Sequence, residues 1–175
     1  ARSSSETELA GFPNHSLNTY LPKLVKAGLR VAICDQLEDP KLTKTIVNRG
    51  VTELITPGLA IIDEVLSPKT NNFLAAISLG KQIGISFLDV STGEFLISQG
   101  TVDEVDKLLQ NFNPSEILVF KQKKQDFSSK FSYPYQLFYL EDWVFQHDFA
   151  KESICTHFKT RNLKGFGIES LNDCV

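Results

Sequence analysis

The stretch "NNFLAAISLGKQIGISFLDVSTGEFLISQG", residues 71–100, contains three runs of strand-forming residues separated by two short turns. The runs occupy residues 73–79, 83–90 and 94–99, with Gly80-Lys81 and Ser91-Thr92-Gly93 between them. Turns this short join neighbouring antiparallel strands. The stretch therefore predicts a three-stranded antiparallel meander, which decides the fold of the second part of the chain.

The residues after the meander alternate between helical and strand patterns. We expect a helix over 102–112, a buried strand over 115–120, a polar loop over 121–130, a strand over 135–140 and a helix from Asp148, its N-cap, to about Lys159. Three hairpin strands followed by helix, strand, strand and helix predict a mixed sheet covered by helices. The fold class is therefore α/β, of the ribonuclease H type.

The first part of the chain begins with a predicted helix. Apolar residues recur at helical spacing from Leu17 to Val25, and Gly28 is suited to end the helix in the left-handed conformation. The start of the helix depends on Pro22. With Thr19 as N-cap the proline falls in the first turn, whereas Ser16 as N-cap would force a kink.

Two strands and a connection follow this helix. Residues 29–36 are expected to form a buried strand in which Cys34 is small and inert, and residues 50–58 a second strand. Two prolines and two adjacent acids between residues 57 and 70 indicate a connection between two units. We therefore divide the chain into a partial mixed α/β unit (1–57), a linker (58–70) and a second α/β domain (71–175).

Composition narrows the classes of function. The chain has 175 residues and a net charge of −3, and its first 70 residues are electrically neutral, so a free-standing nucleic-acid-binding module is not indicated. Three cysteines without CxxC spacing favour reduced thiols in a cytoplasmic protein. No apolar run is long enough to span a membrane, and the absence of methionine indicates a piece of a longer protein.

Asp89, at the end of the second meander strand, is the residue that most resembles a catalytic acid. In ribonuclease H-like folds a carboxylate near this place holds catalytic magnesium, so a magnesium-dependent nuclease is the alternative function. Two-metal chemistry needs several converging carboxylates, and the sequence offers no second acid with a comparable position. We interpret Asp89 as the cap of the Ser-Thr-Gly turn that follows it.

Other polar and aromatic residues have structural interpretations beside functional ones. The basic segment with Lys41, Lys44 and Arg49 is either a solvated loop or a set of phosphate contacts. Phe12 is expected to pack on the first helix, and His157 to lie in or beside the core. No phosphate-binding loop for a nucleoside triphosphate is present in the sequence.

The ordered set of motifs resembles the MutS family of DNA mismatch-repair proteins. "AGFPNHSLNTYLPKLVKAGLRVAICDQLEDP" and "VTELITPG" resemble the second half of the mismatch-binding domain. "NNFLAAI", "GISFLDVSTGEF", "NPSEILV" and "FKTRNLKGFGIE" resemble the connector domain, which stops here before its last expected helix. The resemblance covers residues 9–170, but the family's Phe-x-Glu wedge and phosphate loop do not occur in these residues.

The resemblance implies particular sites. Leu9, Lys41, Lys44 and Arg49 match positions near DNA, and Glu152 and Ser153 match a helix face that docks the MutL partner. It also implies a non-catalytic fragment, without cofactor or metal of its own, that relays between the mismatch-binding and ATPase parts. The parent would be a cytoplasmic homodimer that binds mismatched duplex DNA, ATP and magnesium. A structural adaptor unrelated to DNA is a further alternative.

Overall fold

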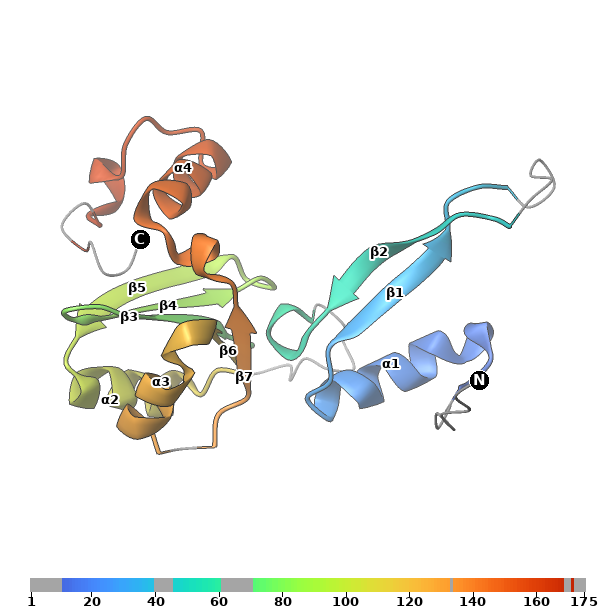
Figure 1. Ribbon diagram of the computed structural model, residues 1–175, viewed down its shortest axis with the longest axis horizontal. Coiled ribbons are helices and arrows are strands. Elements are labelled where there is room, and N and C mark those ends of the chain that lie inside the picture. The colour runs from blue at the N-terminus through green and yellow to red at the C-terminus, as the bar shows by residue number, and fades with distance from the viewer. Residues whose placement is uncertain (1–10, 40–45, 61–70, 133, 169–170, 172–175) are drawn as a thin grey trace, which may run out of the picture.

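The computed structural model describes residues 11–39, 46–60, 71–132, 134–168 and 171. The chain forms two units, each with its own sheet (Figure 1). The first unit contains α1 (Leu17–Lys26), β1 (Val31–Gln36) and β2 (Arg49–Ile55). The second contains β3 (Leu74–Leu79), β4 (Ile83–Asp89), β5 (Glu94–Gly100), α2 (Val102–Phe112), β6 (Glu116–Phe120), α3 (Lys124–Lys130), β7 (Leu137–Leu140) and α4 (His147–His157).

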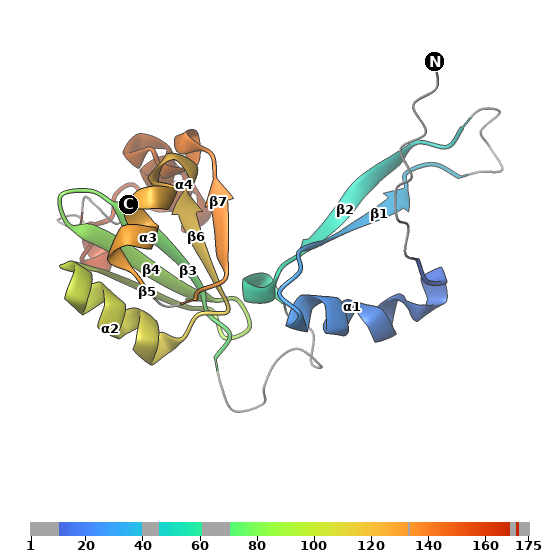
Figure 2. The ribbon, with the colours of Figure 1, turned by 60° about the horizontal axis from the view of Figure 1, so that its bottom comes forward.

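The sheet of the second unit is mixed, with five strands in the order β5-β4-β3-β6-β7. Strands β3, β4 and β5 are antiparallel neighbours, and β6 and β7 run parallel to β3. Helices α2 and α3 lie on one face of this sheet and α4 on the other (Figures 1 and 2). The predicted meander and the predicted ribonuclease H-like mixed sheet are both confirmed.

Alternation along the strands decides which face of the sheet carries the main core. One face presents buried apolar residues to α2 and α3: Ala75, Ile77, Ile85, Phe87, Ile117 and Val119. Val105 and Leu109 of α2 complete that core. The other face carries small residues such as Ala76, Gly84 and Ser86, and a cavity of about 170 Å³ remains between it and the segment around α4.

The polar loop predicted over residues 121–130 is wrong, because this segment forms a 3₁₀ turn (Lys121–Lys123) and then α3. Phe127 explains the helix, since its side chain is 2% exposed and belongs to the core beneath the sheet. In addition, β6 and β7 are parallel, and parallel neighbours require a crossover that lies over one face of the sheet. One apolar residue in a polar run gave no helical periodicity.

Helix α1 begins at Leu17 with Ser16 as N-cap, so Pro22 lies inside the helix. The alternative with Thr19 as N-cap is therefore wrong. Gly28 confirms its predicted role: its φ is +82°, and its N–H donates to the carbonyl of Val25. Phe12 stacks on Tyr20 of α1 at 4.6 Å between ring centroids, as expected.

The prediction of a buried strand over residues 29–36 is wrong, because β1 alternates between half-buried and exposed residues and then becomes exposed. Cys34 is likewise exposed. The reason is that β1 pairs with β2 in a two-stranded sheet and only one face packs on α1, through Val31 and Ile33. Burial of both faces would need a second covering layer.

Two expectations about α4 are also wrong. The helix begins at His147 after Gln146, so Asp148 lies in the first turn and does not cap it. His157 is the last residue of α4 and is exposed, with its ring 4.9 Å from that of Phe158. Across the described residues, no helix has both the length and the apolar character that a membrane span requires.

Candidate functional site

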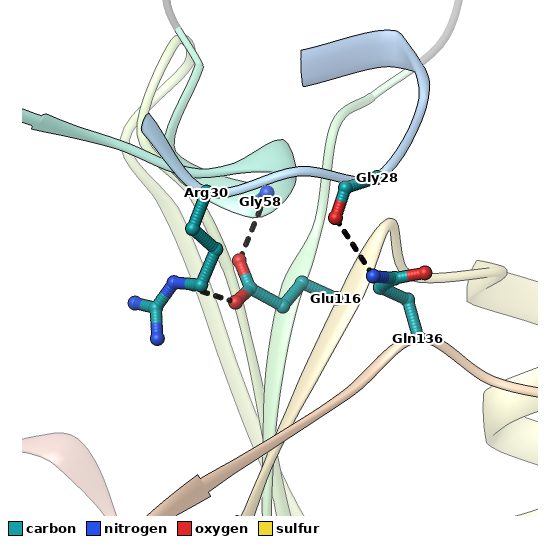
Figure 3. A network of polar contacts seen from close by, with 5 residues as sticks. All are labelled: Gly28, Arg30, Gly58, Glu116 and Gln136. Carbon is teal, nitrogen blue, oxygen red and sulfur yellow. Dashed lines mark hydrogen bonds and ion pairs between the residues drawn. The ribbon is translucent and has the colours of Figure 1, made fainter. Parts of the chain in front are cut away.

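The two units meet at a polar joint (Figure 3). The first unit contributes Gly28 and Arg30, between α1 and β1, and Gly58, in the 3₁₀ turn Pro57–Leu59. The second unit contributes Glu116, the first residue of β6, and Gln136, immediately before β7. These five residues come from two segments on each side, so the joint fixes more than one point of contact.

Glu116 lies at the centre of the joint, and its side chain is 2% exposed. The Nε atom of Arg30 lies 3.4 Å from Oε1 of Glu116, and the N–H of Gly58 donates to Oε2 at 3.3 Å. The guanidinium carbon of Arg30 lies 3.3 Å from the ring centroid of Phe138 in β7. Arg30 is thus held by a carboxylate and an aromatic face of the other unit.

The second contact of the joint is a hydrogen bond across an exposed surface. Nε2 of Gln136 donates to the carbonyl of Gly28 at 2.8 Å. This carbonyl is left without an intrahelical donor where α1 ends, because the chain leaves the helix at Gly28. Gln136 therefore satisfies a backbone acceptor of the first unit from the second unit.

Asn72 holds the connection between the units to the starts of β3 and β6, two interior strands of the large sheet. Its Nδ2 donates to the carbonyl of Pro57 at 2.9 Å, and its Oδ1 accepts from the hydroxyl of Ser115 at 2.6 Å. Residues 56–58 and Ala60 are buried, so the start of the predicted linker packs tightly. Residues 61–70, the rest of that linker, lie outside the described residues.

Asp89 anchors Asn72 and caps the β4–β5 turn. Its Oδ2 accepts from the N–H of Asn72 at 3.1 Å, and its Oδ1 from the hydroxyl and the N–H of Ser91 at 2.6 and 2.9 Å and from the N–H of Thr92 at 3.4 Å. Burial alone would raise the pKa of Asp89, but these hydrogen bonds together hold it below its usual value. The predicted role as a turn cap is confirmed.

Within the described ranges, no three or more His, Cys, Asp or Glu side chains gather where they could hold a metal ion. The converging carboxylates that a two-metal nuclease requires are therefore not found around Asp89 in that part of the chain. Both carboxylate oxygens of Asp89 instead accept hydrogen bonds from the protein. The geometry favours the structural role of this acid.

The predicted DNA-facing and partner-facing residues lie far apart along the chain. Arg49 is exposed at the start of β2, whereas Leu9, Lys41 and Lys44 lie outside the described residues. Glu152 and Ser153 are exposed neighbours on α4. Arg49, Glu152 and Ser153 do not belong to the joint. The joint therefore lies between a surface that was predicted to face DNA and a surface that was predicted to dock a protein partner.

Sequence reasoning did not single out Arg30, Asn72, Glu116 or Gln136 as functional residues. One signal was available for Glu116: an acid opens the apolar run "EILVF", and a charge at that place of a buried strand requires a partner. No local pattern identifies that partner, because Arg30 is far away in the sequence.

The geometry defines a class of protein: a two-unit α/β scaffold whose separate cores are linked by a buried polar joint. Family models identify the units, since MutS domain I matches residues 1–64 and MutS domain II matches residues 72–175. The chain belongs to the MutS family of DNA mismatch-repair proteins.

Similar curated proteins agree with this assignment. The chain is 69% identical to the DNA mismatch repair protein MutS of Flavobacterium psychrophilum over 98% of its length. It is 65% identical to that of Flavobacterium johnsoniae over its full length and 64% identical to that of Christiangramia forsetii over 97%. The chain spans about 20% of the length of each of these relatives.

Proposed function

We propose that this chain is the segment of a mismatch-recognition protein that relays between a mismatch-binding part and an ATPase part. The joint carries this proposal, because it locks two independently packed units together through buried polar contacts without merging their cores. A relay needs such a connection, since a movement imposed on one unit must be passed to the other. The segment itself would be non-catalytic.

The whole protein would be a cytoplasmic homodimeric ATPase that uses ATP and magnesium and binds mismatched duplex DNA. The first unit would face DNA with Leu9 near the minor groove, Lys41 and Lys44 nearest the phosphates and Arg49 as a further basic residue. The exposed position of Arg49 on β2 supports its part in this surface. Glu152 and Ser153 on α4 would dock MutL, and their exposure supports that assignment.

The DNA-binding part is tested by gel-shift of this chain on a duplex with and without one G·T mismatch. We expect weak, non-specific binding with a Kd of about 10⁻⁴–10⁻⁶ M that weakens as salt rises, because phosphate contacts alone would be made. Charge reversal at Lys41, Lys44 and Arg49 should reduce this binding on both duplexes equally. Tight binding that depends on the mismatch would contradict the proposed division of roles.

The docking surface is tested by cross-linking the chain to MutL. Glu152→Lys should abolish most of the cross-link, because it reverses a charge on an exposed helix face. Asp103→Lys is a matched control, since Asp103 is exposed on α2, which lies on the opposite face of the sheet (Figure 1). Equal cross-linking by the Glu152→Lys and control variants would exclude this face as the MutL site.

A further inference from the structure

Glu116 is buried in one unit but obtains its partners from the other. Its backbone belongs to β6, which pairs with β3 inside the large sheet. Among the described residues, both polar partners of its carboxylate, the N–H of Gly58 and the guanidinium of Arg30, belong to the first unit. A charge of the second unit is therefore neutralised only when the first unit is docked.

This arrangement makes a partly opened joint unfavourable. A carboxylate that is 2% exposed has no water shell, so it needs either its protein partners or full access to water. A small separation of the units would remove the partners without admitting enough water. Arg30 would also leave the ring of Phe138, on which its guanidinium rests at 3.3 Å. The closed joint and a fully solvated open joint are the two favourable states.

Gly58 allows the backbone of the first unit to approach β3 and β6 of the second unit closely. A Cβ atom added at Gly58 would lie 2.8 Å from Cδ1 of Leu74, a side chain of β3, and 3.2 Å from Cβ of Glu116. The N–H of Gly58 reaches the carboxylate because no side chain stands between the two backbones. The contact therefore requires a glycine at position 58 and a carboxylate at position 116.

We propose that Arg30 and Glu116 are positioning residues of a latch that holds the two units in one orientation and releases it in an all-or-none manner. The role of this latch in relaying a signal rests on the proposed function, whereas the latch itself is a property of this chain. It makes the connection between the units a switch between two discrete states rather than an elastic hinge.

The test measures the distance between spin labels on the two units by pulsed electron paramagnetic resonance. One label occupies Cys34, which is exposed on β1, and the other Asp103→Cys on α2, with Cys155 and Cys174 replaced by serine. We expect one narrow distance distribution for the parent. Arg30→Met, which keeps an apolar stem over Phe138 but leaves the carboxylate unpaired, should raise a second, separated population at least about tenfold.

The second variant distinguishes a latch from ordinary packing. Adding Glu116→Gln to Arg30→Met should restore much of the closed population, because a neutral amide is less costly to bury without a cation than a carboxylate is. Glu141→Gln is the matched control: it breaks the exposed ion pair with Lys121, which lies wholly within the second unit, and should leave the distribution unchanged.

Three results of the spin-label measurement would contradict the proposed latch. They are an unchanged distribution in Arg30→Met, a single peak that shifts gradually, and a double variant that is more open than Arg30→Met. The α1 amides of Arg30→Met must still exchange more slowly than those of an unfolded chain, since complete loss of their protection would mean unfolding and would also overturn release between folded units. MutL cross-linking tests the proposed function separately, so each can fail alone.

Discussion

At the scale of single residues, Asp89 gives the clearest link between a sequence motif and stability. Its folded-state pKa lies below the unfolded value of 3.8, so its hydrogen bonds contribute stability that is fully present above that value. This contribution is lost as the pH falls through the folded pKa. We therefore expect the free energy of unfolding to drop below about pH 4, and chemical denaturation from pH 7 to pH 2 measures it.

Asp89→Asn tests how much the cap contributes. The substitution replaces one acceptor oxygen by an amide NH₂ group, so at least one donor among Asn72, Ser91 and Thr92 loses its acceptor in a part-buried site, and we expect a loss of about 1–3 kcal/mol at pH 7. The difference from the parent should shrink at acid pH, where the parent loses the same contacts. Glu53→Gln, on an exposed position of β2, is the control.

A comparison of Gly28 with Gly93 tests how tightly the side chain of Gln136 packs against the backbone at the joint. Gly28 lies at the joint, and Gly93 lies in the β4–β5 turn. Both have positive φ, +82° and +76°, so alanine strains either position by about 1 kcal/mol. A Cβ at Gly28 would also lie 2.9 Å from Oε1 of Gln136, whereas one at Gly93 meets nothing within 4 Å. We expect Gly28→Ala to lower the urea midpoint more than Gly93→Ala does, and equal effects would show that Gln136 yields freely.

At the scale of elements, the sequence predicts what depends on local pattern. Alternating residues and short turns define β3, β4 and β5, and the apolar spacing of residues 102–112 defines α2. Helix α3 has one buried anchor and no periodicity, so its existence follows from the parallel β6–β7 crossover, which only the assembled sheet reveals. The joint was missed for the same reason, since Arg30 and Glu116 become neighbours only after both units fold.

The anchoring role of Phe127 in α3 leads to a prediction at this scale. Phe127→Ala should cost about 3–5 kcal/mol, because the side chain is 2% exposed in the main core and its removal leaves a cavity. Phe95→Ala, on the edge strand β5, removes the same atoms from a side chain that is 40% exposed and should cost much less. Urea denaturation of both variants at pH 7 measures the difference, and similar losses would mean that α3 is held by other contacts.

At the scale of the whole molecule, the two cores differ greatly in size. The core of the second unit joins buried residues from three strands and two helices. That of the first unit consists of Leu21, Val25, Ile55 and Ala60 with three half-buried neighbours. A core this small supplies little stability of its own, so docking through the joint adds to the stability of the first unit.

This inequality predicts that the chain opens in two steps. Amide protons of β1 and β2 should exchange through a partial opening in which β3, β4 and β6 stay folded, since those strands hold the larger core. Native-state hydrogen exchange in rising urea should give two separate opening free energies, the lower one for the first unit. Arg30→Met should lower that value alone, because the latch holds the small unit and contributes nothing inside the large one. A single opening free energy shared by all five strands would mean instead that the joint makes the two cores one cooperative unit.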